Sequence, residues 1–265
     1  MIKTIQYRGA SIRFSDAGEG EALVFLHGYL LSLDVWQKFV APLTANYRVV
    51  CIDLPGHGKS GLVEPVSTME IMADTVIAVL NSLMISKAVF FGHSMGGYAT
   101  LALLQKRPDV FKGISLFHSH TLPDNEEVKI KRDREVKLID KGHKNLLVSQ
   151  SIPNMFASDL LEKHNKSVQA CKQLAKDMGD NEVKAAILGL RSRPDRSKLL
   201  SMAPCPCLNI IGRKDNFISF DEVAMKTDLP SDSARLIAEN TGHMGFFEEP
   251  EFIRTGILQF LNRIL

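Results

Sequence analysis

A serine lies at the centre of the pentapeptide Gly92-His93-Ser94-Met95-Gly96, between an apolar run and a helix-like stretch. Residues 88–91 have the character of a buried strand, and residues 97–104 have that of a helix. A strand that turns directly into a helix needs small residues where its two arms pass, and glycines stand at both ends of the pentapeptide. Such a turn holds the serine oxygen outward, beside free N–H groups at the start of the helix. The pentapeptide alone arises by chance in roughly one chain of this length in ten, so its strand-turn-helix setting carries the inference.

Short apolar runs recur along the chain and alternate with helical patterns. They are continuous rather than alternating in polarity, which is typical of strands covered on both faces. The runs other than residues 88–91 are 23–26, 49–52, 114–117, 207–211 and 235–238. This order predicts an α/β fold with a mostly parallel central sheet flanked by helices.

Two further features refine this prediction. Residues 5–7 and 12–14 indicate an antiparallel hairpin at the sheet edge. A helix is expected after Ser67, which can cap it together with Glu70 three residues later.

The strand-helix rhythm breaks between residues 121 and 200. This stretch has several helical patterns but no strand-like apolar run, and its basic residues outnumber its acidic ones. We interpret it as a helical cap, or lid, inserted into the sheet domain; the alternative is that it holds only more packing helices. The predicted organisation is therefore an α/β core domain of residues 1–120 and 201–265 with a cap of residues 121–200.

Composition narrows the function classes. The net charge of +2 and the charged content of 23% give no argument for nucleic acid as a partner. The four cysteines are too few and too scattered for a disulfide framework, and no apolar stretch is long enough for a membrane span. We therefore expect a cytoplasmic enzyme acting on a small molecule, with no metal ion or organic cofactor; the sequence does not indicate the oligomeric state.

A serine nucleophile needs a base to remove its proton, and the base needs an acid to orient it. Among the eight histidines, His243 follows a strand-like run, which places it at the carboxyl edge of a parallel sheet. Asp215 directly follows the preceding run and is the candidate acid; Asp124, after the strand before that, is the competitor. The resulting order of Ser94, Asp215 and His243 is the one expected of a single fold in particular.

Five motifs in order make the chain resemble the α/β-hydrolase fold family. They are His27-Gly28 after an early strand, Asp53-Leu54-Pro55-Gly56-His57-Gly58-Lys59-Ser60, the pentapeptide around Ser94, Gly212-Arg213-Lys214-Asp215, and Gly242-His243. The resemblance spans the chain except for the cap. It implies that the backbone N–H groups of Tyr29 and Met95 form the oxyanion hole.

The same resemblance implies a serine hydrolase that cleaves a carboxylic ester, thioester or lactone of a small or medium acyl substrate through an acyl-enzyme. Two alternatives stay open: a carbon–carbon bond hydrolase or lyase on the same residues, and a receptor-like protein that binds a ligand under the cap. Candidates for the substrate pocket are His27, His93, Met155 and Phe156, although His27 more readily braces the oxyanion loop. Leu146, Leu147 and Ile152 are further apolar candidates in the cap.

Overall fold

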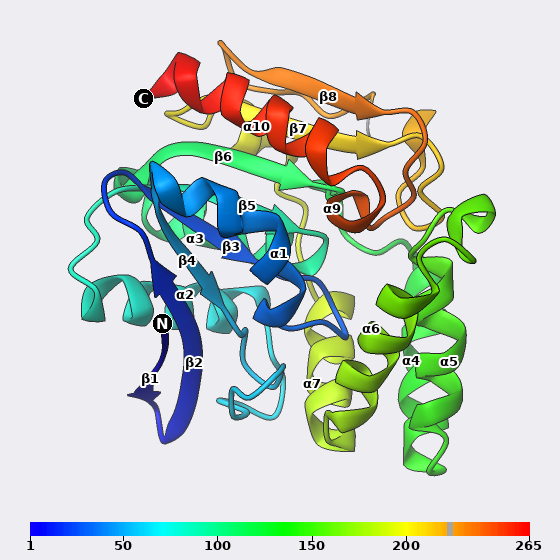
Figure 1. Ribbon diagram of the computed structural model, residues 1–265. Helices are drawn as coiled ribbons and strands as arrows, with labels where there is room; N and C mark the ends of the chain where they lie inside the picture. Colours follow the sequence, from blue (N-terminus) through cyan, green and yellow to red (C-terminus); the bar gives the residue numbers. More distant parts are fainter. Residues whose placement is uncertain (222–224) are drawn as a thin grey trace.

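The computed structural model describes residues 1–221 and 225–265 and has a central sheet between layers of helices (Figure 1). Eight strands of the described residues form one sheet in the order β1-β2-β4-β3-β5-β6-β7-β8. Their bounds are β1 Ile2–Tyr7, β2 Ala10–Ala17, β3 Ala22–Leu26, β4 Arg48–Ile52, β5 Ala88–His93, β6 Phe111–Phe117, β7 Cys207–Gly212 and β8 Ala234–Ala238. All the strands expected from apolar runs are present.

The sheet is parallel from β4 to β8 and antiparallel at its first edge. β1 pairs with β2, and β2 pairs with β4, both antiparallel. The hairpin predicted at the edge is therefore confirmed. Arg8 and Gly9 make its two-residue turn with φ of 47° and 83°, the left-handed conformation that matches the twist of a tight hairpin.

The apolar runs are continuous because both faces of the sheet are covered. Along β3, Leu23 and Phe25 belong to one apolar cluster, while Val24 and Leu26 belong to the other. Successive side chains of a strand point to opposite faces, so a strand buried on both faces has no polar positions to alternate.

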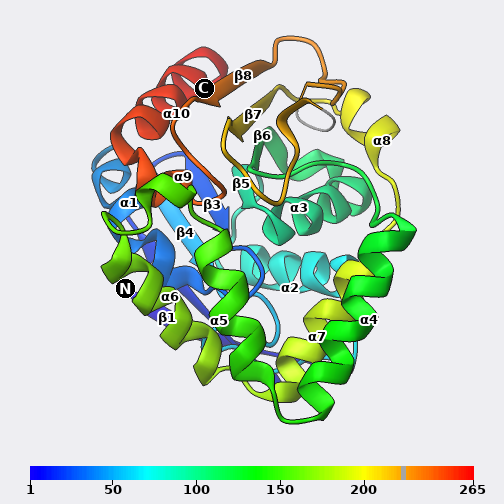
Figure 2. The same cartoon turned by 90° about the vertical axis from the view of Figure 1, so that its right-hand side faces the viewer.

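Helices supply both covering layers (Figure 2). The helices of the core are α1 Gln37–Val40, α2 Met69–Ser82, α3 Met95–Lys106, α9 Gly245–Glu248 and α10 Pro250–Ile264. Residues of α2 and α3 pack in the cluster that contains Val24, whereas α1 and α10 contribute to the cluster that contains Phe25. No helix of the described residues is long and apolar enough to cross a membrane.

The N-cap residue of helix α2 differs from the predicted one by one position. Thr68, not Ser67, is the N-cap, and its hydroxyl accepts a hydrogen bond from the Ile71 N–H at 3.2 Å. Ser67 is fully buried, and its backbone N–H donates to the carbonyl of Ala185, which belongs to the 121–200 segment. The residue before the N-cap is thus engaged by a distant helix, a contact that no local pattern encodes.

Residues 121–200 contain helices and no strand, as expected. The helices are α4 Glu126–Asp140, α5 Lys144–Asn154, α6 Asn165–Asp177, α7 Asp180–Arg191 and α8 Ser197–Ser201. α4 packs against α7 and α5, and α5 packs against α6, while α8 lies against α3. In Figure 1 the group α4–α7 lies beside the sheet, on the side toward which β6 and β7 point.

Candidate active site

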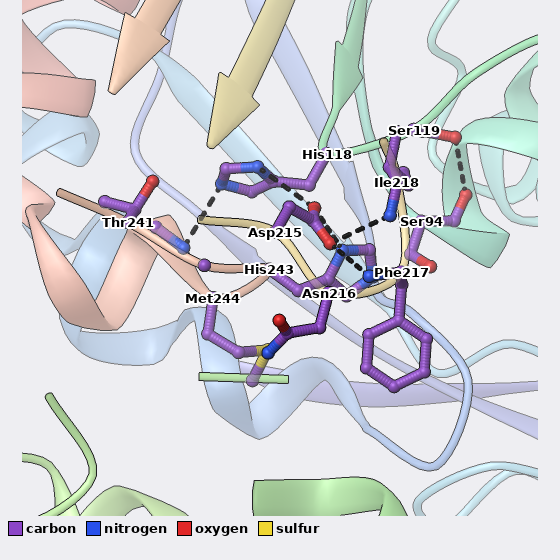
Figure 3. A network of polar contacts seen from close by, with 12 residues as sticks. Ser94, His118, Ser119, Asp215, Asn216, Phe217, Ile218, Thr241, His243 and Met244 are labelled. Carbon is purple, nitrogen blue, oxygen red and sulfur yellow. Dashed lines mark hydrogen bonds and ion pairs between the residues drawn. The ribbon is translucent and has the colours of Figure 1, made fainter. Parts of the chain in front are cut away.

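Ser94 occupies the sharp turn between β5 and α3. Its φ of 50° and ψ of −114° lie outside the conformations that residues other than glycine ordinarily adopt. A Cβ at Gly92 would lie 2.5 Å from the carbonyl oxygen of Gly96, so the two arms pass as closely as the sequence indicates. The Ser94 N–H donates to Phe117 O at 3.0 Å, and the Ser119 hydroxyl donates to Ser94 O at 2.8 Å (Figure 3). These bonds hold the strained turn in place.

His243 and Asp215 meet at the ends of β8 and β7. His243 Nδ1 lies 2.7 Å from Asp215 Oδ2, and both side chains are almost fully buried. Because an ionised carboxylate only accepts, Nδ1 carries the proton and Nε2 carries the lone pair that a general base needs. The other oxygen, Asp215 Oδ1, accepts from the backbone N–H groups of Phe217 and Ile218 at 2.8 and 3.0 Å (Figure 3). The carboxylate is thereby fixed toward the imidazole.

Asp124, the competing acid, is engaged elsewhere. Its Oδ1 lies 2.5 Å from Arg193 Nη1, and its Oδ2 lies 3.2 Å from Arg132 Nε. All three residues belong to the cap, so both ion pairs lie within it. The structure thus brings Asp215, and not Asp124, to His243.

A second buried histidine, His118, lies beside the same carboxylate. His118 Nε2 accepts from the Gly245 N–H at 3.2 Å, which leaves the proton on Nδ1. Nδ1 is 3.8 Å from Asp215 Oδ2, too long for a hydrogen bond but close enough for electrostatic attraction (Figure 3). Burial, together with the nearby His243, holds the pKa of His118 well below its usual value of 6.5, so the ring stays neutral. Sequence reasoning did not assign His118 this place, since only the fold brings it to the acid loop.

The loop that carries His243 is held from beneath by Glu248. Glu248 Oε2 accepts from the N–H groups of Gly242 and Met244 at 3.0 and 3.1 Å, and Oε1 accepts from the Ala157 N–H at 2.7 Å. Burial raises the pKa of this carboxyl, while the three N–H donors oppose that rise. The His243 N–H itself donates to a cap carbonyl at 2.8 Å, which further joins the loop to residues 155–157. No sequence pattern pointed to this carboxylate.

The two amides expected to form the oxyanion hole are available. Among the described residues, neither the Tyr29 N–H nor the Met95 N–H has a hydrogen-bond acceptor. Met95 is the first residue of α3, where the N–H groups have no partner within the helix. His27 braces the neighbouring loop: its Nδ1 lies 2.8 Å from Gly28 O, and its Nε2 accepts from the Leu54 N–H at 3.0 Å. Burial lowers the pKa of His27 to about 4, so the ring is neutral.

A cavity of about 820 Å³ opens in front of Ser94 and His243, which both line it. Its walls come from the loops of the sheet and from the cap. The cap residues that line it include Val128, Arg132, Leu138, Leu147, Gln150, Met155 and Arg193. Phe217, whose ring centroid is 5.2 Å from that of His243, adds an aromatic wall.

Of the four residues predicted to form the substrate pocket, only Met155 lines this cavity. His27 and His93 are fully buried beneath it, and His93 Nε2 donates to the His243 carbonyl at 2.8 Å. Phe156 is also fully buried and stacks on Phe247, with ring centroids 6.1 Å apart. The prediction for these three residues is corrected: they support the walls and do not form them.

The further apolar candidates in the cap divide in the same way. Leu147 lines the cavity, whereas Ile152 is buried behind it and Leu146 is half exposed to solvent. Apolar residues of one helix face several directions, and the sequence did not indicate which side faces the serine.

The described residues offer no cluster of side chains suited to bind a metal ion. Within residues 1–221 and 225–265, no group of three or more histidine, cysteine, aspartate or glutamate side chains could hold a metal ion. The described residues supply an imidazole oriented by a carboxylate and a serine that lines the same cavity, together with two amides that have no acceptor.

Several known proteins resemble this chain in sequence or in fold. A family model described as alpha/beta hydrolase fold matches residues 21–250. The chain is 27% identical to a 2-hydroxy-6-oxononadienedioate/2-hydroxy-6-oxononatrienedioate hydrolase of Burkholderia vietnamiensis, over 95% of this chain and 91% of that one. It is 26% identical to a pimeloyl-[acyl-carrier protein] methyl ester esterase of Proteus mirabilis, over 91% and 94%. Among solved structures, a malate-bound thermophilic esterase of Thermogutta terrifontis superposes with a TM-score of 0.91 at 29% identity, covering 99% of this chain and 97% of that one.

Proposed function

The chain belongs to the α/β-hydrolase fold family, and from this premise we propose that it is a serine hydrolase of carboxylic esters, thioesters or lactones. The observation that carries the proposal is the convergence of three chain segments on one cavity. Ser94 stands on a strained turn, His243 lines the same cavity, and Asp215 holds the imidazole at 2.7 Å. The similarity to two esterases, one by sequence and one by structure, supports an ester as substrate.

In the proposed mechanism, Ser94 Oγ attacks the substrate carbonyl and its proton passes to His243 Nε2. The carbonyl π electrons move to oxygen, and the N–H groups of Tyr29 and Met95 stabilise the resulting oxyanion. When the intermediate collapses, the bond to the leaving group breaks and the leaving oxygen takes the proton from His243. Water then attacks the acyl-enzyme by the same path and releases the acid. Asp215 stays ionised throughout and stabilises the imidazolium that forms.

Hydrolysis of a carbon–carbon bond is the second candidate. It is favoured by the similarity to the hydrolase of a nonadienedioate, whose name specifies a chain with carboxylates at both ends. The three proposed catalytic residues, Ser94, His243 and Asp215, and the cavity suit either reaction.

A p-nitrophenyl ester series from acetate to decanoate tests the proposal and separates the candidates. We expect hydrolysis with a maximum at small or medium acyl length, and its loss in Ser94→Ala. No turnover of any ester, thioester or lactone by a folded protein would reject the ester assignment. Turnover of a 2-hydroxy-6-oxo-dienoate in its place would establish the second candidate.

A further inference from the structure

Tyr98 and His120 form a hydrogen-bonded pair inside the cavity that the proposed acyl transfer does not use. Tyr98 Oη lies 2.9 Å from His120 Nε2, and both residues line the cavity together with Ser94. Tyr98 is the fourth residue after Ser94 on α3, so its side chain projects from the same side of the helix. The pair therefore lies close to where a substrate must bind.

The direction of the hydrogen bond between them follows from a third contact. The Leu122 N–H donates to His120 Nδ1 at 3.1 Å, so Nδ1 carries the lone pair. In the neutral ring the proton is then on Nε2, which donates to Tyr98 Oη. Burial lowers the pKa of His120 to about 3 and raises that of Tyr98, so both stay uncharged near neutral pH. The Tyr98 hydroxyl proton is consequently not needed by His120 and is available to a ligand.

Arg193 holds the phenol ring in place. Its guanidinium carbon lies 4.2 Å from the centre of the Tyr98 ring. Arg193 is buried and is itself fixed by Asp124 and by the carbonyls of Leu122 and Leu190, at 3.1 and 3.0 Å. A ring held this firmly presents its hydroxyl in one position, which is a requirement for selective binding.

The charges that line the cavity favour an anion. Among the described lining residues the cations are Lys131, Arg132, Arg134 and Arg193, and the anions are Asp124 and Glu135. Both carboxylates are already paired, Asp124 with two arginines and Glu135 with Arg132 at 3.3 Å. Lys131 and Arg134 have no ion-pair partner within the described part of the chain. The cavity thus has an excess of positive charge together with a free hydroxyl donor.

We propose that the cavity binds a carboxylate group of the substrate beside Tyr98, with the Tyr98 hydroxyl as its hydrogen-bond donor. The inference rests on the proposed function and narrows its substrate to esters or lactones whose acyl chain ends in a carboxylate. Tyr98 is a specificity-determining residue in this account and takes no part in the chemical step. Lys131 and Arg134 of α4 are exposed residues that also line the cavity, and they add positive charge to it.

Matched ligands test the proposal with and without turnover. Mono-p-nitrophenyl adipate and p-nitrophenyl hexanoate share a six-carbon acyl chain and differ by one terminal carboxylate. We expect kcat/KM to be at least tenfold higher for the adipate ester, and this ratio to fall as salt is added. Tyr98→Phe removes only the hydroxyl and should reduce the ratio by about tenfold or more, the effect of one hydrogen bond to a charged group. Lys131→Gln should reduce it less.

Binding of free adipate and of hexanoate, measured by calorimetry on Ser94→Ala, does not depend on catalysis. Adipate should bind more tightly than hexanoate, and adding Tyr98→Phe should weaken only adipate. Tyr7→Phe, on the edge strand β1, is the matched control and should change nothing. Equal binding of the two ligands, or an equal loss of both in Tyr98→Phe, would overturn the carboxylate site. Absence of ester hydrolysis by the protein that retains Ser94, with adipate binding intact, would instead reject the proposed function.

Discussion

The Ala157 N–H donates to Glu248 Oε1 at 2.7 Å, which joins the cap to the loop that carries His243. The second oxygen of Glu248 accepts from the two amides on either side of His243, at 3.0 and 3.1 Å. One buried carboxylate therefore satisfies three backbone donors from two distant parts of the chain. This arrangement couples the position of the imidazole to that of the cap.

Glu248→Gln tests this coupling. The amide keeps one acceptor oxygen but turns an NH₂ group toward N–H donors, which leaves buried donors unsatisfied. We expect unfolding to become easier by about 1–3 kcal/mol and kcat to fall while KM changes little. Urea denaturation and steady-state kinetics measure the two effects. Glu251→Gln, in which the side chain is 85% exposed, is the control. A Glu248→Gln variant with unchanged kcat would refute the coupling.

The two candidate acids give different outcomes when each is neutralised. Asp215→Asn should reduce kcat by about 10⁴, because an asparagine oxygen and NH₂ group no longer fix the productive imidazole tautomer. Asp124→Asn should change kcat far less and act mainly on stability, since its ion pairs with Arg132 and Arg193 are weakened. Kinetics and thermal unfolding on both variants check this. The reverse ranking of kcat would assign the orienting role to Asp124.

The fold was largely predictable because burial on both faces leaves a readable pattern. In β3 every residue is buried, so a short apolar run suffices to identify the strand. Local patterns were less informative at the ends of helices, where residues also contact distant parts of the chain. The N-cap of α2 is Thr68 and not Ser67, whose backbone N–H donates to the carbonyl of Ala185, more than a hundred residues along the chain.

The candidate site was predictable in part for the same reason. The places of Ser94, Asp215 and His243 could be inferred because each follows a strand at the same sheet edge. The cavity wall could not, because a sequence does not show which way each cap residue faces; Met155, directly after α5, faces the cavity, whereas its neighbour Phe156 faces the core. One of the donors to Glu248, the Ala157 N–H, is close to it only in the folded chain.

Buried neutral histidines predict a loss of stability in mild acid. Burial lowers the pKa of His27 to about 4 and of His57 and His120 to about 3. The unfolded chain binds protons at these residues near pH 6.5 and the folded chain does not, so stability falls as the pH drops below 6.5. Each residue contributes up to about 1.4 kcal/mol per pH unit until its folded pKa is reached.

Urea denaturation at pH 7.5, 6.5 and 5.5 measures this dependence. His57→Gln should reduce the slope of the unfolding free energy against pH by up to about 1.4 kcal/mol per pH unit, the contribution of one histidine. The reason is that a glutamine in that position does not titrate. His143→Gln, in a cap turn, is the control and should leave the slope nearly unchanged. A free energy of unfolding that stays constant from pH 7.5 to 5.5 would contradict the burial of these rings in the neutral form.

Substitutions at neighbouring cap residues should have different effects. Met155→Ala enlarges the cavity and should move the preferred acyl length upward, in a graded way, since one methylene in such a pocket is worth about 1–3 kcal/mol. Phe156→Ala opens a hole in the core and should cost about 3–5 kcal/mol of stability while leaving the order of preference unchanged. A chain-length series with thermal unfolding distinguishes them. A shift in preferred length from Phe156→Ala alone would show that the cavity wall is wrongly assigned.

The central claim is that Ser94 is the nucleophile. The most direct measurement is incubation of the folded protein with a fluorophosphonate, followed by peptide mass spectrometry to locate the adduct. We expect a single adduct on Ser94, no adduct in Ser94→Ala, and a loss of turnover in that variant of about 10⁶ if the three residues act as a unit. An adduct on another serine, or near-normal turnover by Ser94→Ala, would contradict the account.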